Sequence, residues 1–471
     1  MSSKPLLHSR ILHRQFNSFF VPKARPLPYG SQNRHALNAR LSSSTATNDD
    51  SEETIHYDIL ESVESIWGYC PGGYHPLTLG ELLHDRYRVI HKLGYGSSST
   101  VWLARDEQSD QNVALKVGES KRRTSEVDII TALGRSQSNF FNVSGEMMIP
   151  TVLDTFKIRG PNGVHPCYVT TTCGPSLRDL KGEWSADLFQ IDVARALAAQ
   201  LVLAVELVHA QGIVHGDIHL GNILLHNRPN FNKLPVKQIY KRFRKPQLQV
   251  VSRADGRPNP RGVPSHLVTP IWLGKACERI TLAEARIQLI DFGDYHNGLD
   301  YMECSLWNSS TPECRFEKPK PPSFPSDVWA MACTIWEIIA NFTLFEKYSY
   351  CADDITRDNV EVLGMLPPEW WSAWGARAES YREDGTPIKK NEIRTWEARF
   401  ENSIQKPRNK RGMPLIGARE REAIFNMLRP MLKYRPEDRC TTRQVLESEW
   451  MVQWALPEYE KAKRLPWKSL R

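Results

Sequence analysis

The chain has 471 residues, 41% hydrophobic and 24% charged, which is enough to bury two or three cores and argues against wholesale disorder. Its net charge of +7 comes from residues 1–48: their seven basic residues have no acidic counterpart, and removing them from the 61 leaves 54 basic against 54 acidic residues. A formally neutral body excludes a general polyanion-binding surface, so we expect no direct contact with nucleic acid.

Cysteine usage and hydropathy indicate an intracellular chain without a membrane span. The nine cysteines are scattered and form no C-x-x-C pair, which argues against a disulfide framework or a zinc site. The most apolar run, residues 328–340, is shorter than the roughly 20 residues that a membrane helix needs, and it contains Glu337.

The N-terminus is read as a separate segment. Residues 1–48 mix basic residues with scattered Leu, Ile and Phe, which fits an amphipathic mitochondrial presequence. The alternative is a disordered basic tail on a cytoplasmic or nuclear protein. Residues 49–86 form an extension ahead of the first predicted strands.

Two β-strands with a glycine-containing turn follow at residues 87–105. The turn carries Gly94 and Gly96, and Ser99 stands where a third glycine would complete G-x-G-x-x-G. Glycines allow backbone N–H groups to approach a phosphate closely. A plain β-hairpin turn explains the same residues, so the motif is weak by itself.

The next strand, residues 113–117, places Lys116 between apolar neighbours. A lysine there can reach a phosphate if a carboxylate steadies it. The nearest candidate is Glu126, in the first turn of a helix that we expect Thr124 and Ser125 to cap and Gly134 to end. Ile129 and Ile130 share its helix face, so Glu126 should point toward the core.

The central stretch is Ile-Val-His-Gly-Asp-Ile-His-Leu-Gly-Asn-Ile-Leu-Leu at residues 213–225. A long apolar helix over residues 188–211, stopped by Gly212, should hold this loop rigidly. Asp217, Asn222 five residues later and Asp291 of a later Asp-Phe-Gly form one constellation. Such a group of residues is suited to binding magnesium and a polyphosphate next to an attacking hydroxyl.

Between these motifs lies a basic insertion. Residues 227–280 contain twelve basic residues against only Asp255 and Glu278. We expect a solvated excursion, with a docking surface for an acidic partner as the alternative. Further on, a buried helix is predicted over residues 326–339, and residues 350–411 are polar and Trp-rich with weak periodicity.

Taken in order, these motifs resemble the eukaryotic protein-kinase domain over residues 87–455. Gly-Tyr-His-Pro at residues 73–76 and Pro-Ile-Trp-Leu-Gly-Lys-Ala at 270–276 resemble the SR-protein-kinase-like group, in its divergent fungal type. The resemblance implies an α+β bilobal fold, with a small β-rich N-lobe at residues 87–174 and a larger, mainly helical C-lobe at residues 175–460.

The same resemblance implies an ATP-dependent serine/threonine protein kinase with Mg²⁺ as cofactor. Asp217 would accept the proton of the substrate hydroxyl, with His219 beside the transferring phosphate, while Asn222 and Asp291 would hold Mg²⁺. The remaining nucleotide-binding residues that it implies are Gly94, Gly96, Val101, Ala114, Lys116, Glu126, Thr171 and Cys173. Glu313 and Arg439 would form a buried structural ion pair. The substrate would be a protein, in this group an Arg/Ser-rich one, and we expect a monomer.

Two departures from the family pattern bear on activity. Gly216 replaces the Arg that usually pairs with a phosphorylated activation loop, so we expect activity without a phosphate between Asp294 and Thr311. His219 replaces a Lys, and imidazole, with a reference pKa of about 6.5, is only partly charged at neutral pH, which predicts slow turnover.

Two other functions stay open. The departures are compatible with a nucleotide-binding pseudokinase scaffold. His-Gly-Asp-x-His-x-Gly-Asn also resembles the loop of aminoglycoside- and choline-type small-molecule phosphotransferases.

Overall fold

The computed structural model describes residues 55–121, 126–140, 148–182, 187–292, 311–318, 321–345, 351–389 and 395–467. The chain divides into two units, Met1–Thr54 and Ile55–Arg471, and every described residue belongs to the second. The presequence of residues 1–48 and the helix caps Thr124 and Ser125 therefore lie outside the described residues.

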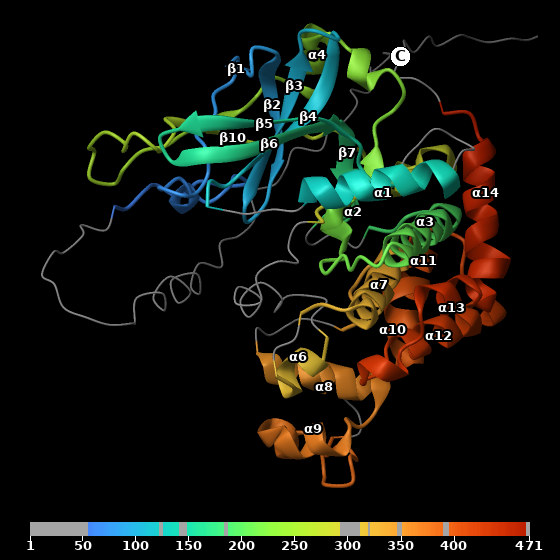
Figure 1. The fold of residues 1–471 in the computed structure, drawn as a ribbon. Helices are drawn as coiled ribbons and strands as arrows, with labels where there is room; N and C mark the ends of the chain where they lie inside the picture. Colours follow the sequence, from blue (N-terminus) through green and yellow to red (C-terminus); the bar gives the residue numbers. More distant parts are fainter. Residues whose placement is uncertain are drawn as a thin grey trace, which may run out of the picture. The chain divides into compact units, whose positions relative to one another are not determined.

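The first part of this unit is one antiparallel sheet of six strands (Figure 1). Its order is β1-β2-β3-β4-β6-β5, and the strands are Leu82–Leu83, Tyr87–Tyr95, Ser99–Asp106, Gln111–Gly118, Val152–Gly160 (β5) and Gly163–Thr171 (β6). Trp102, Leu115 and Val169 pair across β3, β4 and β6 and are buried on one face. Because alternate residues of a strand point to opposite sides, their neighbours Val101 and Lys116 lie on the other face.

The rest of the unit is largely helical, as the kinase resemblance implied. Its core contains α3 (Ile191–Ala210) and α7 (Phe324–Ile339), which pack against each other. The α3 helix is buried along most of its length. Ser323 caps α7 by accepting a hydrogen bond from Ser326 N–H, with Pro325 in the first turn, where a proline loses no hydrogen bond.

Shorter elements complete the architecture. A three-stranded sheet has the order β11-β8-β7, with strands Cys173–Ser176 (β7), Ile223–His226 (β8) and Ile287–Leu289 (β11). The other helices are α1 Glu126–Phe140, α2 Leu177–Lys181, α4 Val236–Phe243, α6 Glu313–Phe316, α8 Ala352–Leu363, α9 Pro368–Ala373, α10 Trp396–Phe400, α11 Lys406–Lys410, α12 Ala418–Met431, α13 Thr442–Leu446 and α14 Leu456–Arg464. None of the helices within the described ranges has the length and apolarity to cross a bilayer.

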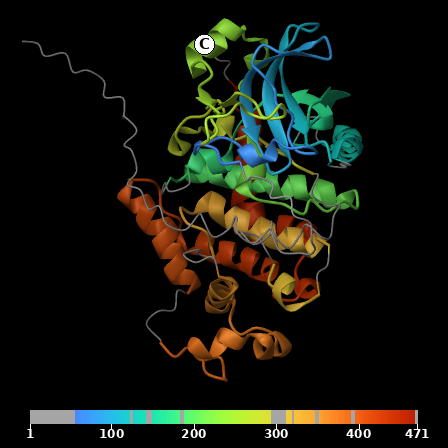
Figure 2. The same cartoon turned by 90° about the vertical axis from the view of Figure 1, so that its left-hand side faces the viewer.

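The basic insertion is not a solvated excursion, so that expectation was wrong. Its helix α4 packs Ile239 against Ile90 and Leu103 of the large sheet, where Figures 1 and 2 show it beside the strands. The side chain of Asn112 donates hydrogen bonds of 2.9 Å to the carbonyls of Phe231 and Leu234. The charge count hid this because Lys and Arg lie on the exposed side of α4 while a few apolar residues carry the packing.

The insertion also meets the extension that precedes the first strand. Its hairpin of β9 (Leu248–Val250) and β10 (His266–Val268) contributes Leu267 to an apolar cluster with Tyr69 and Tyr74. Backbone hydrogen bonds join the two segments, one of them from Asp58 N–H to the carbonyl of Ser252 at 3.0 Å. Residues far apart in sequence thus form one layer beside the sheet.

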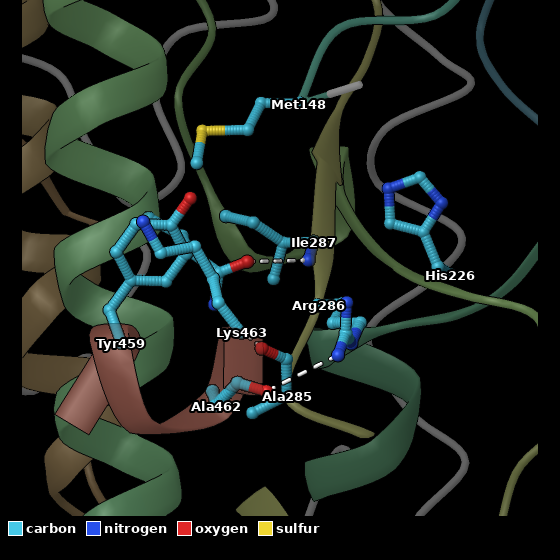
Figure 3. A pocket seen from close by; sticks show the side chains of 9 residues that line it. Met148, His226, Ala285, Arg286, Ile287, Tyr459, Ala462 and Lys463 are labelled. Carbon is cyan, nitrogen blue, oxygen red and sulfur yellow. Dashed lines mark hydrogen bonds between the residues drawn. The ribbon is translucent and has the colours of Figure 1, made fainter. Parts of the chain in front are cut away.

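The C-terminal helix α14 packs against α3 and residues 282–284, and its Tyr459, Ala462 and Lys463 line one pocket with Arg286 and Ile287 (Figure 3). Arg286 donates from Nη2 to the carbonyl of Ala462 at 3.2 Å, and its guanidinium lies 5.0 Å from the ring centre of Trp467. A small pocket opens here between Met148 and Tyr459, lined by none of the predicted site residues. It therefore does not mark the nucleotide site.

Most predicted elements are present, with shifted ends. The helix predicted over residues 188–211 is α3, Ile191–Ala210. The stop predicted at Gly134 was wrong, because α1 continues to Phe140. A helical glycine costs only about 1 kcal/mol, and the burial of Ile130 and Leu133 in the core outweighs that. None of the eight cysteines in the described ranges forms a disulfide.

Candidate active site

Strand pairing places Val101, Ala114 and Lys116 on one face of the sheet. Val101 of β3 pairs directly with Lys116 of β4, and Ala114 lies two residues before Lys116. Directly opposed residues in antiparallel strands, and residues two apart in one strand, point to the same side. An apolar surface therefore adjoins the ammonium group, as a nucleotide base beside its phosphates would require.

Lys116 is the centre of a three-residue charge cluster. Its Nζ lies 2.8 Å from both carboxylate oxygens of Glu126 and 2.9 Å from Asp291 Oδ1. The expected Lys116–Glu126 ion pair is thus present. Burial disfavours the ammonium ion, but the charges of Asp291 and Glu126 outweigh it and hold the pKa of Lys116 well above its usual value. The lysine is a fixed cation, with 17% of its side chain exposed.

Asp217 and Asn222 are joined within the loop between α3 and β8. Asn222 Nδ2 donates to Asp217 Oδ2 at 3.0 Å and to the Asp217 carbonyl at 2.9 Å. Burial opposes ionisation of Asp217, but the hydrogen bond that its carboxylate accepts from His219 outweighs burial, so the pKa of this carboxyl is lowered. Asp217 is therefore an oriented carboxylate at neutral pH.

His219 lies beside Asp217 in a defined orientation. Its Nδ1 accepts a hydrogen bond of 2.9 Å from Gly221 N–H, and its Nε2 is 3.3 Å from Asp217 Oδ2. A nitrogen that accepts an N–H carries no proton, so Nε2 is the donor and the imidazole is neutral in this arrangement. His219 thus orients Asp217 and, in this form, brings no positive charge toward a phosphate.

Asp327, at the start of α7, fixes the backbone of this loop. Its carboxylate accepts hydrogen bonds of 2.8 Å from the N–H groups of His215 and Gly216, and it lies 2.9 Å from His209 Nε2. Gly216 has a φ of +82°, a conformation that glycine adopts without strain. Asp327 was not among the predicted site residues. The available signal was a carboxylate in the first turn of an apolar helix.

Strand pairing brings Asn222 and Asp291 to the same edge of the small sheet. Ile223 pairs with Leu289, and Ile290 N–H donates to the Asn222 carbonyl at 2.9 Å. Asp291 follows with a φ of +68°, a value uncommon for a residue with a side chain. The predicted metal ligands are therefore neighbours, although far apart in sequence.

This pair suits a hard cation that keeps ligands from outside the protein. No cluster of three or more His, Cys, Asp or Glu side chains in the described ranges is placed to hold a metal ion. One carboxylate and one amide oxygen fit Mg²⁺, which prefers oxygen ligands and usually retains water or phosphate oxygens as well.

The glycine-containing turn connects β2 to β3. Gly96 N–H donates to the Ser99 carbonyl at 2.9 Å, which closes the turn. Ser99 begins β3, pairs with Gly118 and has no positive φ, so this position does not require glycine. The incomplete motif thus forms a regular turn, next to Gly94, which pairs with Val101.

The segment from Thr171 to Cys173 links the two sheets, as expected for an adenine-binding connector. Thr172 Oγ1 accepts a 3.0 Å hydrogen bond from Asn227 Nδ2 and lies 2.5 Å from Asn232 Oδ1. The Cys173 thiol contacts Gln288 Oε1 at 3.1 Å, and burial raises its pKa to about 12. Asn227 and Asn232 come from the insertion, and their sequence context carried no signal for this contact.

The predicted buried ion pair is also present. Arg439 Nη1 lies 2.9 Å from Glu313 Oε1, and Nη2 lies 2.5 Å from Oε2, a bidentate geometry. The guanidinium also donates to the carbonyls of Lys433, Tyr434 and Pro325. Gly293 and residues 294–310, where loop phosphorylation was predicted to be dispensable, lie outside the described residues.

Comparison with known proteins finds similarity to protein kinases. The protein kinase domain model matches residues 87–237. The serine/threonine-protein kinase SRPK of Physarum polycephalum is 24% identical over 421 residues, covering 84% of this chain and 93% of its own. Protein kinase dsk1 of Schizosaccharomyces pombe is 37% identical and the human SRSF protein kinase 3 34% identical, covering 34% and 35% of this chain and 30% of each relative.

These matches agree with the geometry of the site. Lys116 contacts both Glu126 and Asp291, and Asn222 donates a hydrogen bond to Asp217. The chain therefore belongs to the protein kinase family, as a serine/threonine protein kinase of the SRPK type.

Proposed function

We propose that this kinase transfers the γ-phosphate of ATP to a protein hydroxyl with Asp217 as the catalytic base. The observation that carries the proposal is the pairing of Asp217 with Asn222 and His219, which holds an ionised carboxylate in one orientation. A carboxylate held in this way can accept a proton from the substrate hydroxyl as phosphate transfer proceeds.

The nucleotide would occupy the sheet face that carries Val101, Ala114 and Lys116, with its base near Thr171 and Cys173. Lys116 would bind the α- and β-phosphates while Glu126 keeps its ammonium group in place. Gly94 and Gly96 would let the turn approach the phosphates. Asn222 and Asp291 would hold Mg²⁺, which neutralises phosphate charge when bound.

We further propose an Arg/Ser-rich protein as substrate, because the human relative is named an SRSF protein kinase. Acidic residues of α8 are natural candidates to meet arginines, but several already have partners. Asp354 pairs with Arg357 at 2.6 Å, and Asp353 pairs with Arg315. An Arg-rich peptide would have to displace these internal arginines.

Two contacts argue against the alternatives. The Glu313–Arg439 ion pair joins segments on either side of α7, and peptide kinases use such a brace whereas small-molecule phosphotransferases have no need of it. A scaffold that only binds nucleotide needs no carboxylate held in one orientation, as that of Asp217 is by its contacts with Asn222 and His219.

The test is phosphate transfer from ATP and Mg²⁺ to a peptide array, with the full chain and with Asp217→Asn. We expect transfer by the wild type and a loss of about 100-fold or more in the variant, in the range that a general base contributes. Arrays with and without arginine flanking the serine test the substrate class. ATP binding by the wild type without transfer above the variant would favour the scaffold.

A further inference from the structure

The extension ahead of the kinase sheet touches the glycine-containing turn through one side chain. The hydroxyl of Tyr74 lies 2.7 Å from the Gly96 carbonyl oxygen and 3.0 Å from that of Ser97. Its single proton is shared between these two acceptors. No other side chain in the described ranges forms a hydrogen bond with either carbonyl.

Tyr74 is held firmly at its own position. The residue is 5% exposed, and its ring meets the ring of Tyr69 edge-on at a centroid distance of 5.5 Å. Its backbone N–H donates to the Gly68 carbonyl at 2.7 Å, and its own carbonyl accepts from Asn162 Nδ2 at 2.8 Å. Burial raises the pKa of the phenol, so the hydroxyl keeps its proton and remains a donor. The contact to the turn therefore comes from a fixed point.

This contact determines where the amide groups of the turn point. In a planar trans peptide, the carbonyl of one residue and the N–H of the next point in opposite directions. With the carbonyls of Gly96 and Ser97 turned toward Tyr74, the N–H groups of Ser97 and Ser98 point away from it. The Ser98 carbonyl is also fixed, because it accepts from Glu119 N–H at 2.9 Å.

Those two N–H groups form no hydrogen bond with any other group in the described part of the chain. Successive unpaired N–H groups in a turn make a site that favours anions, above all phosphate oxygens. The turn lies directly next to β3, whose Val101 pairs with Lys116. The donors and the ammonium group thus belong to the same phosphate-binding region.

We propose that Tyr74 is a positioning residue for the nucleotide: it fixes the turn at residues 96–98 so that the N–H groups of Ser97 and Ser98 face the triphosphate. The extension then contributes to the nucleotide site from outside the sheet. This inference rests on the proposed binding of ATP.

The experiment compares the full-length wild type with Tyr74→Phe, which removes only the hydroxyl, and with Tyr240→Phe. Tyr240 is the matched control, because its hydroxyl also donates to a backbone carbonyl of β2, that of Ile90 at 3.0 Å, away from the turn. Without nucleotide, amide hydrogen exchange is measured at Gly96, whose N–H closes the turn by donating to the Ser99 carbonyl at 2.9 Å. KM for ATP and kcat are measured separately.

We expect faster exchange in the turn and a KM for ATP raised by about fivefold in Tyr74→Phe, the loss expected for one hydrogen bond, with kcat within about twofold. Tyr240→Phe should match the wild type in both. Unchanged exchange in Tyr74→Phe would overturn the proposal, as would faster exchange with an unchanged KM. Failure of the wild type to bind ATP would instead contradict the proposed function, and the exchange measurement would still show whether Tyr74 holds the turn.

Discussion

Two lysines of the same sheet, Lys92 and Lys116, each pair with a glutamate but have opposite electrostatic character. Lys92 has no exposed side-chain surface, and its Nζ lies 4.9 Å from the ring centre of Trp102. Within the described ranges, Glu64 is the only carboxylate with which it forms an ion pair. Burial lowers its pKa more than Glu64 raises it. Lys116 keeps some exposure and has both Glu126 and Asp291, and its pKa is raised.

We interpret this difference as that between a structural ion pair at Lys92 and the proposed phosphate-binding group at Lys116. An enclosed pair has lost its water and cannot accept a further partner, so Lys92 and Glu64 serve to join the extension to β2. A cation with two carboxylates and an open side can exchange one of them for a phosphate. Lys116 lies between Leu115 and Val117 and Lys92 between His91 and Leu93, and neither local sequence indicates which carboxylates surround the lysine in the fold.

The largest effect on folding should come from Lys92→Met. It leaves Glu64 buried without its cation, and breaking a buried pair in this way costs about 3–5 kcal/mol. We expect this loss in the free energy of unfolding, measured with urea. The double variant Lys92→Met/Glu64→Leu should recover most of it, because replacing both charges is often close to neutral. A double variant no more stable than Lys92→Met would contradict this account.

A smaller loss in the free energy of unfolding is expected when the buried ion pair of Glu313 and Arg439 is broken. Its guanidinium retains the carbonyls of Lys433, Tyr434 and Pro325, whereas no hydrogen bond from Lys92 Nζ to a carbonyl is present in the described ranges. Glu313→Gln should therefore cost about 2 kcal/mol, the range of a hydrogen bond to a charged group. A cost equal to that of Lys92→Met would show that the backbone acceptors contribute nothing.

His75 is a buried base for which the described ranges contain no carboxylate partner, so its neutral form should be favoured. His75 lies 4.9 Å from His165, and burial, together with the charge of His165, lowers its pKa from 6.5 to about 4. The unfolded chain then binds more protons between these two pH values, so stability should fall as the pH falls from about 6.5 to about 4. His75→Gln should make this slope shallower in urea titrations. An unchanged slope would place the pH dependence on other residues, such as His91 and His165.

The smallest effect on folding is expected from Lys116→Arg. The variant keeps the positive charge beside Glu126 and Asp291, so the free energy of unfolding should change by about 1 kcal/mol or less. Thermal unfolding measures it. A loss as large as that of Lys92→Met would mean that Lys116 is as structural as Lys92.

The motifs were sufficient to predict residues that the fold brings together. Lys116, Asp217, Asn222 and Asp291 were identified because each lies at a fixed place relative to an apolar strand or helix, and strand register then brings them together. The Lys116–Glu126 and Glu313–Arg439 contacts were expected and are present. The direct bond from Lys116 to Asp291 depends on how the two sheets meet, which no local pattern contains.

What escaped prediction depends on contacts between distant segments. The basic insertion was expected to be solvated, yet Ile239 and Phe231 bury a narrow apolar stripe that its many charges concealed. Tyr74 was noted only as part of Gly-Tyr-His-Pro at residues 73–76, and its contact with the Gly96 carbonyl depends on a turn more than 20 residues away. The continuation of α1 past Gly134 likewise reflects tertiary packing that outweighs a local preference.

The most direct test measures phosphate transfer to peptide at saturating ATP by the wild type, Lys116→Arg and Lys92→Met/Glu64→Leu in one assay. Arginine cannot reproduce the compact ammonium contact with phosphates, so we predict a loss of about 100-fold in Lys116→Arg, the scale of one lost electrostatic contact to the transition state. The double variant should transfer at close to the wild-type rate. Wild-type activity in Lys116→Arg, or equal losses in both variants, would contradict the assignment of Lys116 to the nucleotide and of Lys92 to the fold.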